Sequence, residues 1–220
     1  MVLATPTTYK SSISTSKTLK TSVSPGPAAG TYIFHPTSAY TYQKGQSGGQ
    51  SAGWRSSSDD YYHGNGSIYG STRGAQYTYF FFGSNAINAH LVTNGADATA
   101  VAARVSKIEI YMKRATAAVG SGDSQRPSFA MHTYGSKPST PSFASLWDEY
   151  TYTGHQADYL SKGEGNWYVV PPNFLVAWRN GLVGGTYDGV VWGDTSSNYM
   201  QADRNLSAAT PNGTVRITLT

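Results

Sequence analysis

Aromatic side chains set among Gly, Ser and Asp are the residues of this chain whose types and spacing most directly suggest chemistry. They lie in segments 54–74 and 146–152 and are Trp54, Tyr61, Tyr62, Tyr69, Trp147, Tyr150 and Tyr152. A flat aromatic ring stacks on the C–H face of a pyranose, while neighbouring Asp, Asn and Arg side chains bind the sugar hydroxyls. These rings are therefore candidates for a glycan-binding site. The alternative is that they pack the loops onto the domain or against a neighbouring subunit, because large rings pack more often than they bind ligands.

Two further patterns bear on catalysis. The segment Gly45–Gly49 (GQSGG) matches the Gly-x-Ser-x-Gly pattern of a nucleophile elbow, but it lies in a polar loop without the strand and helix that the elbow needs. The acidic pairs Asp59-Asp60 and Asp148-Glu149 suit turns, because adjacent carboxylates point to opposite faces of a strand. We therefore predict a protein without catalytic residues. A polysaccharide-degrading enzyme stays an alternative, since its two carboxylates need not be close in sequence.

The residues that bind metals and cofactors do not form recognisable patterns. The chain has no cysteine, and its five histidines (His35, His63, His90, His132 and His155) are far apart in sequence. None has the short paired spacing of a metal site. No Gly-rich stretch is followed by Lys-Ser or Lys-Thr, so a phosphate-binding loop is not expected. The sequence predicts neither a metal nor a cofactor.

The positive charge is confined to the start of the chain. Residues 1–50 hold four lysines and no arginine or acid, whereas residues 51–220 hold twelve bases and twelve acids, so the net charge of +4 comes from the first fifty residues. We predict that residues 1–30 form an extended basic arm rich in Ser and Thr, which cannot fold alone and serves assembly through Lys10, Lys17 and Lys20. Four lysines without arginine are a weak signal for nucleic acid, so no nucleic-acid partner is expected.

Residues 31–220 read as one β-domain. The clearest strand is 105–114, in which Ile108, Ile110 and Met112 share one face and Lys107, Glu109, Tyr111 and Lys113 share the other. Further strands are predicted at 31–35, 39–43, 76–82, 128–134, 166–171, 187–192 and 213–220. Short helices are predicted at 85–91, capped by Ser84, and at 173–180, ended by Gly181. Segment 54–74 is expected to be irregular, and Trp167, Trp178 and Trp192 are expected in or near the core.

Short strands, long polar loops and little helix predict an all-β fold, an antiparallel β-sandwich (jelly roll) with one or two short helices and the N-terminal arm. Charged residues make up only 13% of the chain, and 17 residues are tyrosine. Extracellular, viral-surface and sugar-contacting β-proteins have such compositions. Insertion into a membrane is not expected, because no apolar run approaches the roughly 20 residues that span a bilayer. The first residues also lack the pattern of a signal peptide.

Three segments carry a resemblance to a known family. They are KIEIYMKR (107–114), GEGNWYVVPPNFLVAWRNGLVGGTYDGVVWG (163–193) and TVRITLT (214–220), joined by Trp54-Arg55, Asp60-Tyr61-Tyr62-x-Gly64 and Arg73-Gly74 upstream. Together they resemble the C-terminal domain common in minor tail proteins of phages that infect actinobacteria, over residues 40–220. The resemblance implies a jelly-roll module, similar to carbohydrate-binding modules, that is displayed on a virion.

These observations lead to one expected function and two alternatives. We expect a non-enzymatic protein on the surface of a phage particle, a minor tail or receptor-binding module that contacts host-envelope glycans. Its arm would dock to other virion proteins, and the protein is expected to form a homo-oligomer. The alternatives are a capsid decoration protein that stabilises the shell and a polysaccharide-degrading enzyme.

Overall fold

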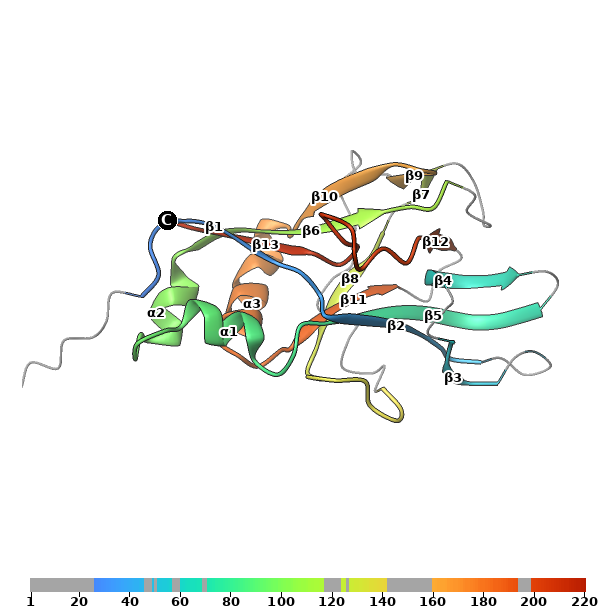
Figure 1. Cartoon of the computed structure of the whole chain (residues 1–220), viewed down its shortest axis with the longest axis horizontal. Helices are drawn as coiled ribbons and strands as arrows, with labels where there is room; N and C mark the ends of the chain where they lie inside the picture. Colours follow the sequence, from blue (N-terminus) through green and yellow to red (C-terminus); the bar gives the residue numbers. More distant parts are fainter. Residues whose placement is uncertain are drawn as a thin grey trace, which may run out of the picture.

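Two antiparallel β-sheets face each other and form a β-sandwich, which confirms the predicted fold class (Figure 1). The computed structural model describes residues 26–45, 49, 51–56, 60–68, 71–116, 124–125, 127–141, 160–193 and 199–220. Thirteen strands and three short helices lie within these ranges. The predicted arm residues Lys10, Lys17 and Lys20 lie outside them.

The smaller sheet has four strands in the order β1-β13-β6-β10. The strands are β1 (Gly30–Phe34), β13 (Val215–Leu219), β6 (Val105–Lys113) and β10 (Gly165–Val169). Every pairing is antiparallel. As predicted, alternate residues point into the core. Ile108, Ile110, Met112, Val215, Ile217 and Leu219 are each at most 2% exposed. The alternation leaves the other side of this sheet facing away from the core.

The larger sheet has seven strands, with β2 and β11 on opposite sides of β5. The strands are β2 (Ser38–Gln43), β3 (Gly53–Trp54), β4 (Tyr61–Ile68), β5 (Ser71–Phe81), β8 (Phe129–His132), β11 (Gly189–Gly193) and β12 (Met200–Ala202). A separate pair joins β7 (Ser124–Gln125) to β9 (Leu160–Ser161). From β5 onward the main strands β6, β8, β10, β11 and β13 alternate between the two large sheets, which is the winding of a jelly roll.

Segment 54–74 is not irregular, so this expectation was wrong. It contains the end of β3, all of β4 and the beginning of β5, and β4 pairs with β5 through a bulged register. The glycines that suggested a loop serve the strands instead. Gly64 and Gly74 both have positive φ, and a Cβ added to Gly74 would overlap with the backbone of Gly45. Glycine is needed here for backbone conformation and close approach rather than to end the strands.

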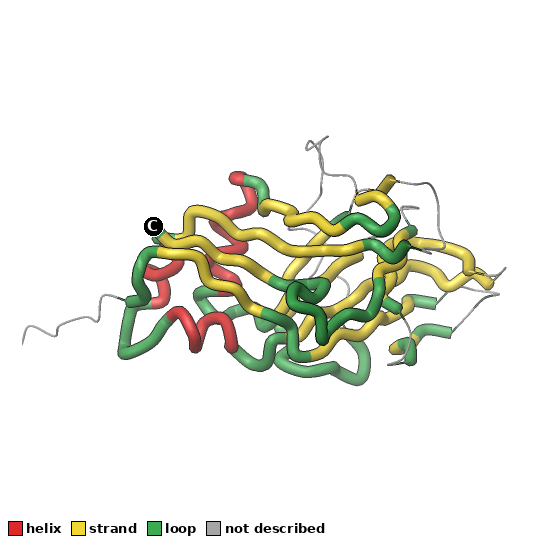
Figure 2. The backbone as a smooth tube through the Cα atoms, turned by 45° about the horizontal axis from the view of Figure 1, so that its top comes forward, coloured by secondary structure: helices red, strands yellow, loops and turns green. Residues whose placement is uncertain are grey.

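Three helices gather at one end of the sandwich, as Figure 2 shows in red, and close the space between the sheets. They are α1 (Ala86–Leu91), α2 (Ala98–Ala103) and α3 (Pro172–Leu182). The sequence did not predict α2, whose six residues are too few to show a helical period; Asp97 caps it by accepting a hydrogen bond from Thr99 N. Asn85, not Ser84, precedes α1, in a left-handed conformation without a side-chain cap.

Helix α3 fits the prediction except at its C-terminus. Trp178 is fully buried, as expected for the core. Gly181 does not end the helix, which continues to Leu182. A Cβ at Gly181 would overlap with the ring of Tyr187, so this glycine permits close packing within the helix rather than terminating it.

Arg104 joins distant parts of the chain at the helical end. Its Nε donates to Thr220 O at 2.9 Å and its Nη1 donates to Pro27 O at 2.7 Å. Thr220 N in turn donates to Arg104 O at 2.9 Å. The residues that precede β1 and those that follow β13 are therefore fixed side by side next to α2 (Figure 1).

Candidate functional site

Tyr61 does not fit the predicted glycan site. Its side chain is 1% exposed and packs edge-to-face on Phe80 between the two sheets, with ring centroids 5.4 Å apart. Burial raises the pKa of Tyr61 to about 12, although the nearby Arg204 opposes this shift. A ring enclosed in this way cannot stack on a sugar. The prediction was wrong because Tyr61 lies in β4 and turns inward, not in an exposed loop.

Tyr62 is also buried, at 7% exposure. One neighbour is Tyr199, whose ring is stacked at 5.9 Å, and the guanidinium of Arg55 lies 4.1 Å from the centroid of the Tyr62 ring. These contacts make Tyr62 a packing residue, the alternative that the sequence had left open.

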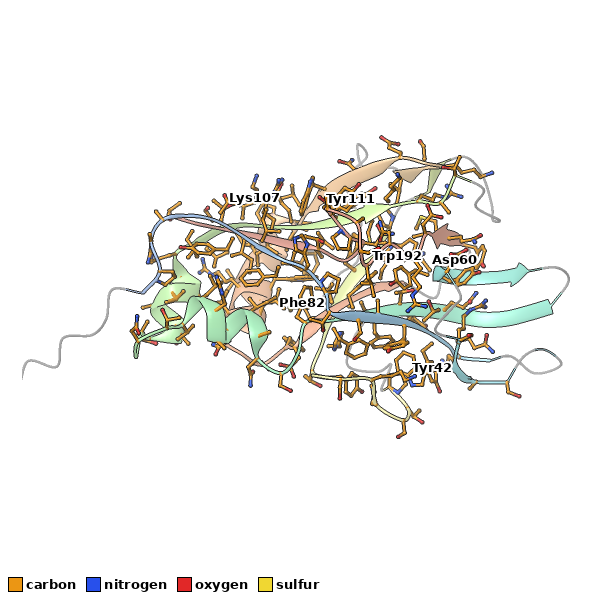
Figure 3. The ribbon with its side chains drawn as sticks, in the orientation of Figure 1. Tyr42, Asp60, Phe82, Lys107, Tyr111 and Trp192 are labelled. Carbon is orange, nitrogen blue, oxygen red and sulfur yellow. The ribbon has the colours of Figure 1, made fainter. Side chains whose placement is uncertain are left out.

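Trp54 is half-buried on the side of the larger sheet that faces away from the core. It forms an aromatic cluster with Tyr40, Tyr42 and Tyr79, at centroid distances of 6.4, 5.1 and 5.3 Å. Its indole Nε1 donates to Pro138 O at 2.8 Å. Figure 3 shows Tyr42 of this cluster on the far side of the sheet from Trp192. Tyr69, Trp147, Tyr150 and Tyr152 lie outside the described residues.

The smaller sheet carries a second surface, which the sequence did not single out. We call it the outer face, and it consists of Ile33, Lys107, Glu109, Tyr111, Lys113, Trp167, Val169 and Arg216. In Figure 3, Lys107 and Tyr111 point away from the other sheet. Cross-strand register creates this surface: Arg216 on β13 lies beside both Ile33 and Glu109, and Glu109 lies beside Val169.

A paired charge lies at the centre of the outer face. Arg216 Nε and Nη2 each donate to one oxygen of Glu109 at 2.7 Å, and Lys107 Nζ lies 3.2 Å from the same carboxylate. The Glu109 side chain is only 6% exposed. Burial alone would raise the pKa of Glu109, but its hydrogen bonds to Arg216 and Lys107 outweigh burial and hold the pKa below 4.5. The carboxylate therefore stays charged at neutral pH and fixes the orientation of Arg216.

Two aromatic rings extend this network. The Arg216 guanidinium lies 4.1 Å from the centroid of the Trp167 ring, and the Tyr111 ring lies 5.3 Å from that of Trp167. The Tyr111 hydroxyl occupies space that a Cβ on Gly165 would fill, so the ring lies against the neighbouring strand. Ile33 and Val169 flank the network at 54% and 43% exposure. The outer face thus sets two aromatic rings beside the Arg216 guanidinium, which Glu109 holds in one orientation.

Part of this surface could be predicted from the sequence. Period-2 alternation correctly predicted that Lys107, Tyr111 and Lys113 lie on the solvent-facing side of the strand. Glu109 is on the same side but is buried beneath Arg216 and Lys107. Trp167 was expected in or near the core and instead lies half-buried on the outer face. Its position depends on pairing with β6, and no signal within residues 166–171 indicates that pairing.

Only some of the acidic and histidine residues considered in the sequence lie in the described part of the chain. No three His, Cys, Asp or Glu residues there could hold a metal ion. Asp60 accepts a hydrogen bond from Gln201 Nε2, whereas Asp59, Asp148, Glu149, His155 and Ser47 of the GQSGG segment lie outside the described residues. No helix in the described ranges is long and apolar enough to cross a membrane.

His132 is a titratable group that is fully buried in the larger sheet. Burial lowers its pKa from 6.5 to about 4, although the hydrogen bond to Phe80 O opposes this. Its Nε2 lies 3.0 Å from Phe80 O, and Tyr134 N donates to its Nδ1 at 3.2 Å, so the neutral ring with a proton on Nε2 satisfies both contacts.

We therefore expect acidification to destabilise the fold through His132. Between pH 6.5 and 4 the unfolded chain binds a proton at this residue that the native state does not, so the free energy of unfolding falls by up to about 1.4 kcal/mol per pH unit. Urea unfolding at pH 7.5, 6, 5 and 4.5 measures the slope. His132→Gln should be less sensitive to pH over this window, and equal slopes for the variant and the wild type would contradict the expectation.

Comparison with known proteins provides no family for this chain. No protein-family model matches the sequence, and no curated protein matches it either.

Proposed function

We propose that this protein is a non-enzymatic glycan-binding module of a phage particle and that the outer face makes the glycan contact. The observation that carries the proposal is the fixed arrangement of Arg216, Glu109 and Trp167 on an exposed sheet surface. Rings and pre-oriented N–H donors side by side are what a sugar needs, since its C–H faces pack on rings and its hydroxyls accept hydrogen bonds.

The charge of the outer face indicates the kind of glycan. Three cations, Lys107, Lys113 and Arg216, are set against one carboxylate, Glu109, so the net charge of this surface is +2. Lys107 and Lys113 are exposed, whereas Glu109 is buried beneath its partners. An acidic envelope polysaccharide complements this surface better than a neutral one.

Attachment to the particle would use the helical end. Gly26 packs near Val101 of α2, and Arg104 holds Pro27 and Thr220 there. An arm over residues 1–30 would leave the domain at this end and dock to other virion proteins or to a neighbouring copy. The outer face would then stay available for the host envelope, consistent with the resemblance to phage tail domains.

One observation favours a second candidate, a capsid decoration or other structural virion protein. Exposed Ile33 and Val169 flank the Arg216 network, and clusters of Trp, Tyr and Arg with apolar neighbours are typical of protein interfaces. In that case the outer face would contact another virion protein instead of a glycan.

A binding experiment separates the two. Trp167→Ala should lower the affinity for acidic host-envelope polysaccharide about tenfold, because a stacked ring contributes ~1–2 kcal/mol. Tyr111→Ala should act in the same direction, and raising the salt concentration should weaken wild-type binding. The matched control is Val176→Ala, which removes an exposed side chain from α3.

Binding is measured by pull-down with host envelopes or on a glycan array, beside a thermal melt. Unchanged binding by a folded Trp167→Ala variant would refute the outer face as the glycan site. A wild type that binds no glycan but binds a capsid or tail protein through Trp167 would favour the second candidate.

A further inference from the structure

A cation lies over the aromatic cluster on the other sheet. Lys137, in the loop that follows β8, places its Nζ 4.4 Å from the centroid of the Tyr40 ring and 5.9 Å from that of the Trp54 ring. Both distances are within the range of cation–π attraction. Among the described residues no carboxylate pairs with Lys137, so the rings are the partners that the structure gives this ammonium group.

The rings beneath Lys137 are held in place. Trp54 meets Tyr40 at an interplanar angle of 75° and Tyr42 at 81°, and its Nε1 is bonded to Pro138 O. Tyr79 supports Trp54 from within the sheet and is fully buried. Its hydroxyl has no hydrogen-bond partner within the described ranges. The surface formed by Tyr40 and Trp54 is therefore pre-organised around the position of a cation.

We propose that Tyr40 and Trp54 form a binding site for an organic ammonium group and that Lys137 is its built-in occupant. A quaternary alkylammonium is the ligand class that this site fits. It differs from a lysine ammonium in being weakly hydrated, so it loses less hydration when it contacts the rings. The site lies on the opposite sheet from the outer face, so its test is independent of the test of the glycan proposal.

Competition with Lys137 sets the expected affinity. A side chain tethered within the same domain has a high effective concentration and masks the rings from a free ligand. Lys137 is itself exposed, as are Thr133, Ser136, Ser139 and Thr140 of the same loop, so its removal should uncover the rings without opening the core. Lys137→Ala removes both the charge and the aliphatic stem that cover the rings, whereas a Met in this position would still pack on them.

Titration with choline tests the proposal, with binding followed by NMR of the Trp54 indole N–H. Lys137→Ala should bind choline about tenfold more tightly than the wild type. The neutral isostere 3,3-dimethylbutan-1-ol should bind both the variant and the wild type more weakly than choline does, because the attraction depends on charge. Lys162→Ala, which removes an exposed lysine from the turn between β9 and β10, is the matched control and should behave as the wild type.

Two results would overturn the proposal. One is equal choline affinity, or none, for Lys137→Ala and the wild type. The other is equal binding of choline and its neutral isostere to Lys137→Ala. The double variant Lys137→Ala/Trp54→Leu should lose the gained affinity. If a thermal melt shows that it is unfolded, Lys137→Ala/Tyr40→Leu takes its place in the same comparison.

Discussion

Replacing Ile110 with Asp is expected to lower the free energy of unfolding by about 3 kcal/mol or more, because a carboxylate would be buried without a partner. Ile110 is 1% exposed and lies between Val215 and Tyr168 on the neighbouring strands, with its side chain in the core between the sheets. Urea unfolding at pH 7 measures the loss. If the Ile110→Asp variant does not fold when it is expressed, the loss of stability is larger but in the expected direction.

Lys113→Asp in the same strand is the control. Lys113 is exposed on the outer face, so the substitution places a charge in water and should change stability by less than about 0.5 kcal/mol. Comparable losses for Ile110→Asp and Lys113→Asp would mean that the two faces of β6 are assigned incorrectly.

Trp192→Ala is expected to cost about 3–5 kcal/mol, the range for removing a large buried ring. Trp192 is fully buried between the two sheets, and its ring lies 5.2 Å from that of His63. Its strand β11 lies between β5 and β8, so surrounding side chains cannot fill the cavity without moving the sheet.

Trp167→Ala provides a matched comparison, since it removes the same side chain from a half-buried position on the outer face. We expect it to cost about 1 kcal/mol, mainly from the lost contact with Arg216. Thermal and urea unfolding of both variants test the contrast. If Trp167→Ala proved the more damaging of the two, Trp167 would belong to the core and the outer face would lose its role as a binding surface.

The sandwich could be predicted from the sequence because period-2 alternation is a local property. Residues 105–114 and 213–220 alternate so regularly that their buried faces follow directly, and the structure confirms them. Where glycines interrupt that signal, as in 54–74, the strands were missed. Their glycines serve backbone geometry that depends on partners distant in sequence, such as Gly45 beside Gly74.

The candidate site was less predictable for the same physical reason. Aromatic residues in polar segments indicated rings that bind, yet Tyr61 and Tyr62 are buried, because sequence context does not show which way a side chain turns. The outer face depends on the register between β13, β6 and β10, which brings Arg216, Glu109 and Trp167 together from three separate segments. The contact of Lys137 with Tyr40 likewise requires the loop after β8 to fold over β2.

The hydrogen bonds from Arg104 to Pro27 and Thr220 have a mechanical consequence. A force applied to the chain ahead of Gly26 first loads the bond from Arg104 Nη1 to Pro27 O and then reaches β1 at Gly30. Since β1 runs away from the helical end, the pull acts along its axis, and the five residue pairs from Gly30–Leu219 to Phe34–Val215 bear it together in shear. Backbone hydrogen bonds loaded in parallel resist force far better than bonds that open one at a time. Under the proposed function, in which residues ahead of Gly26 attach the domain to a particle, the strand pairing at the edge of the smaller sheet would bear the load and pass it through β13 to the strands that carry the outer face.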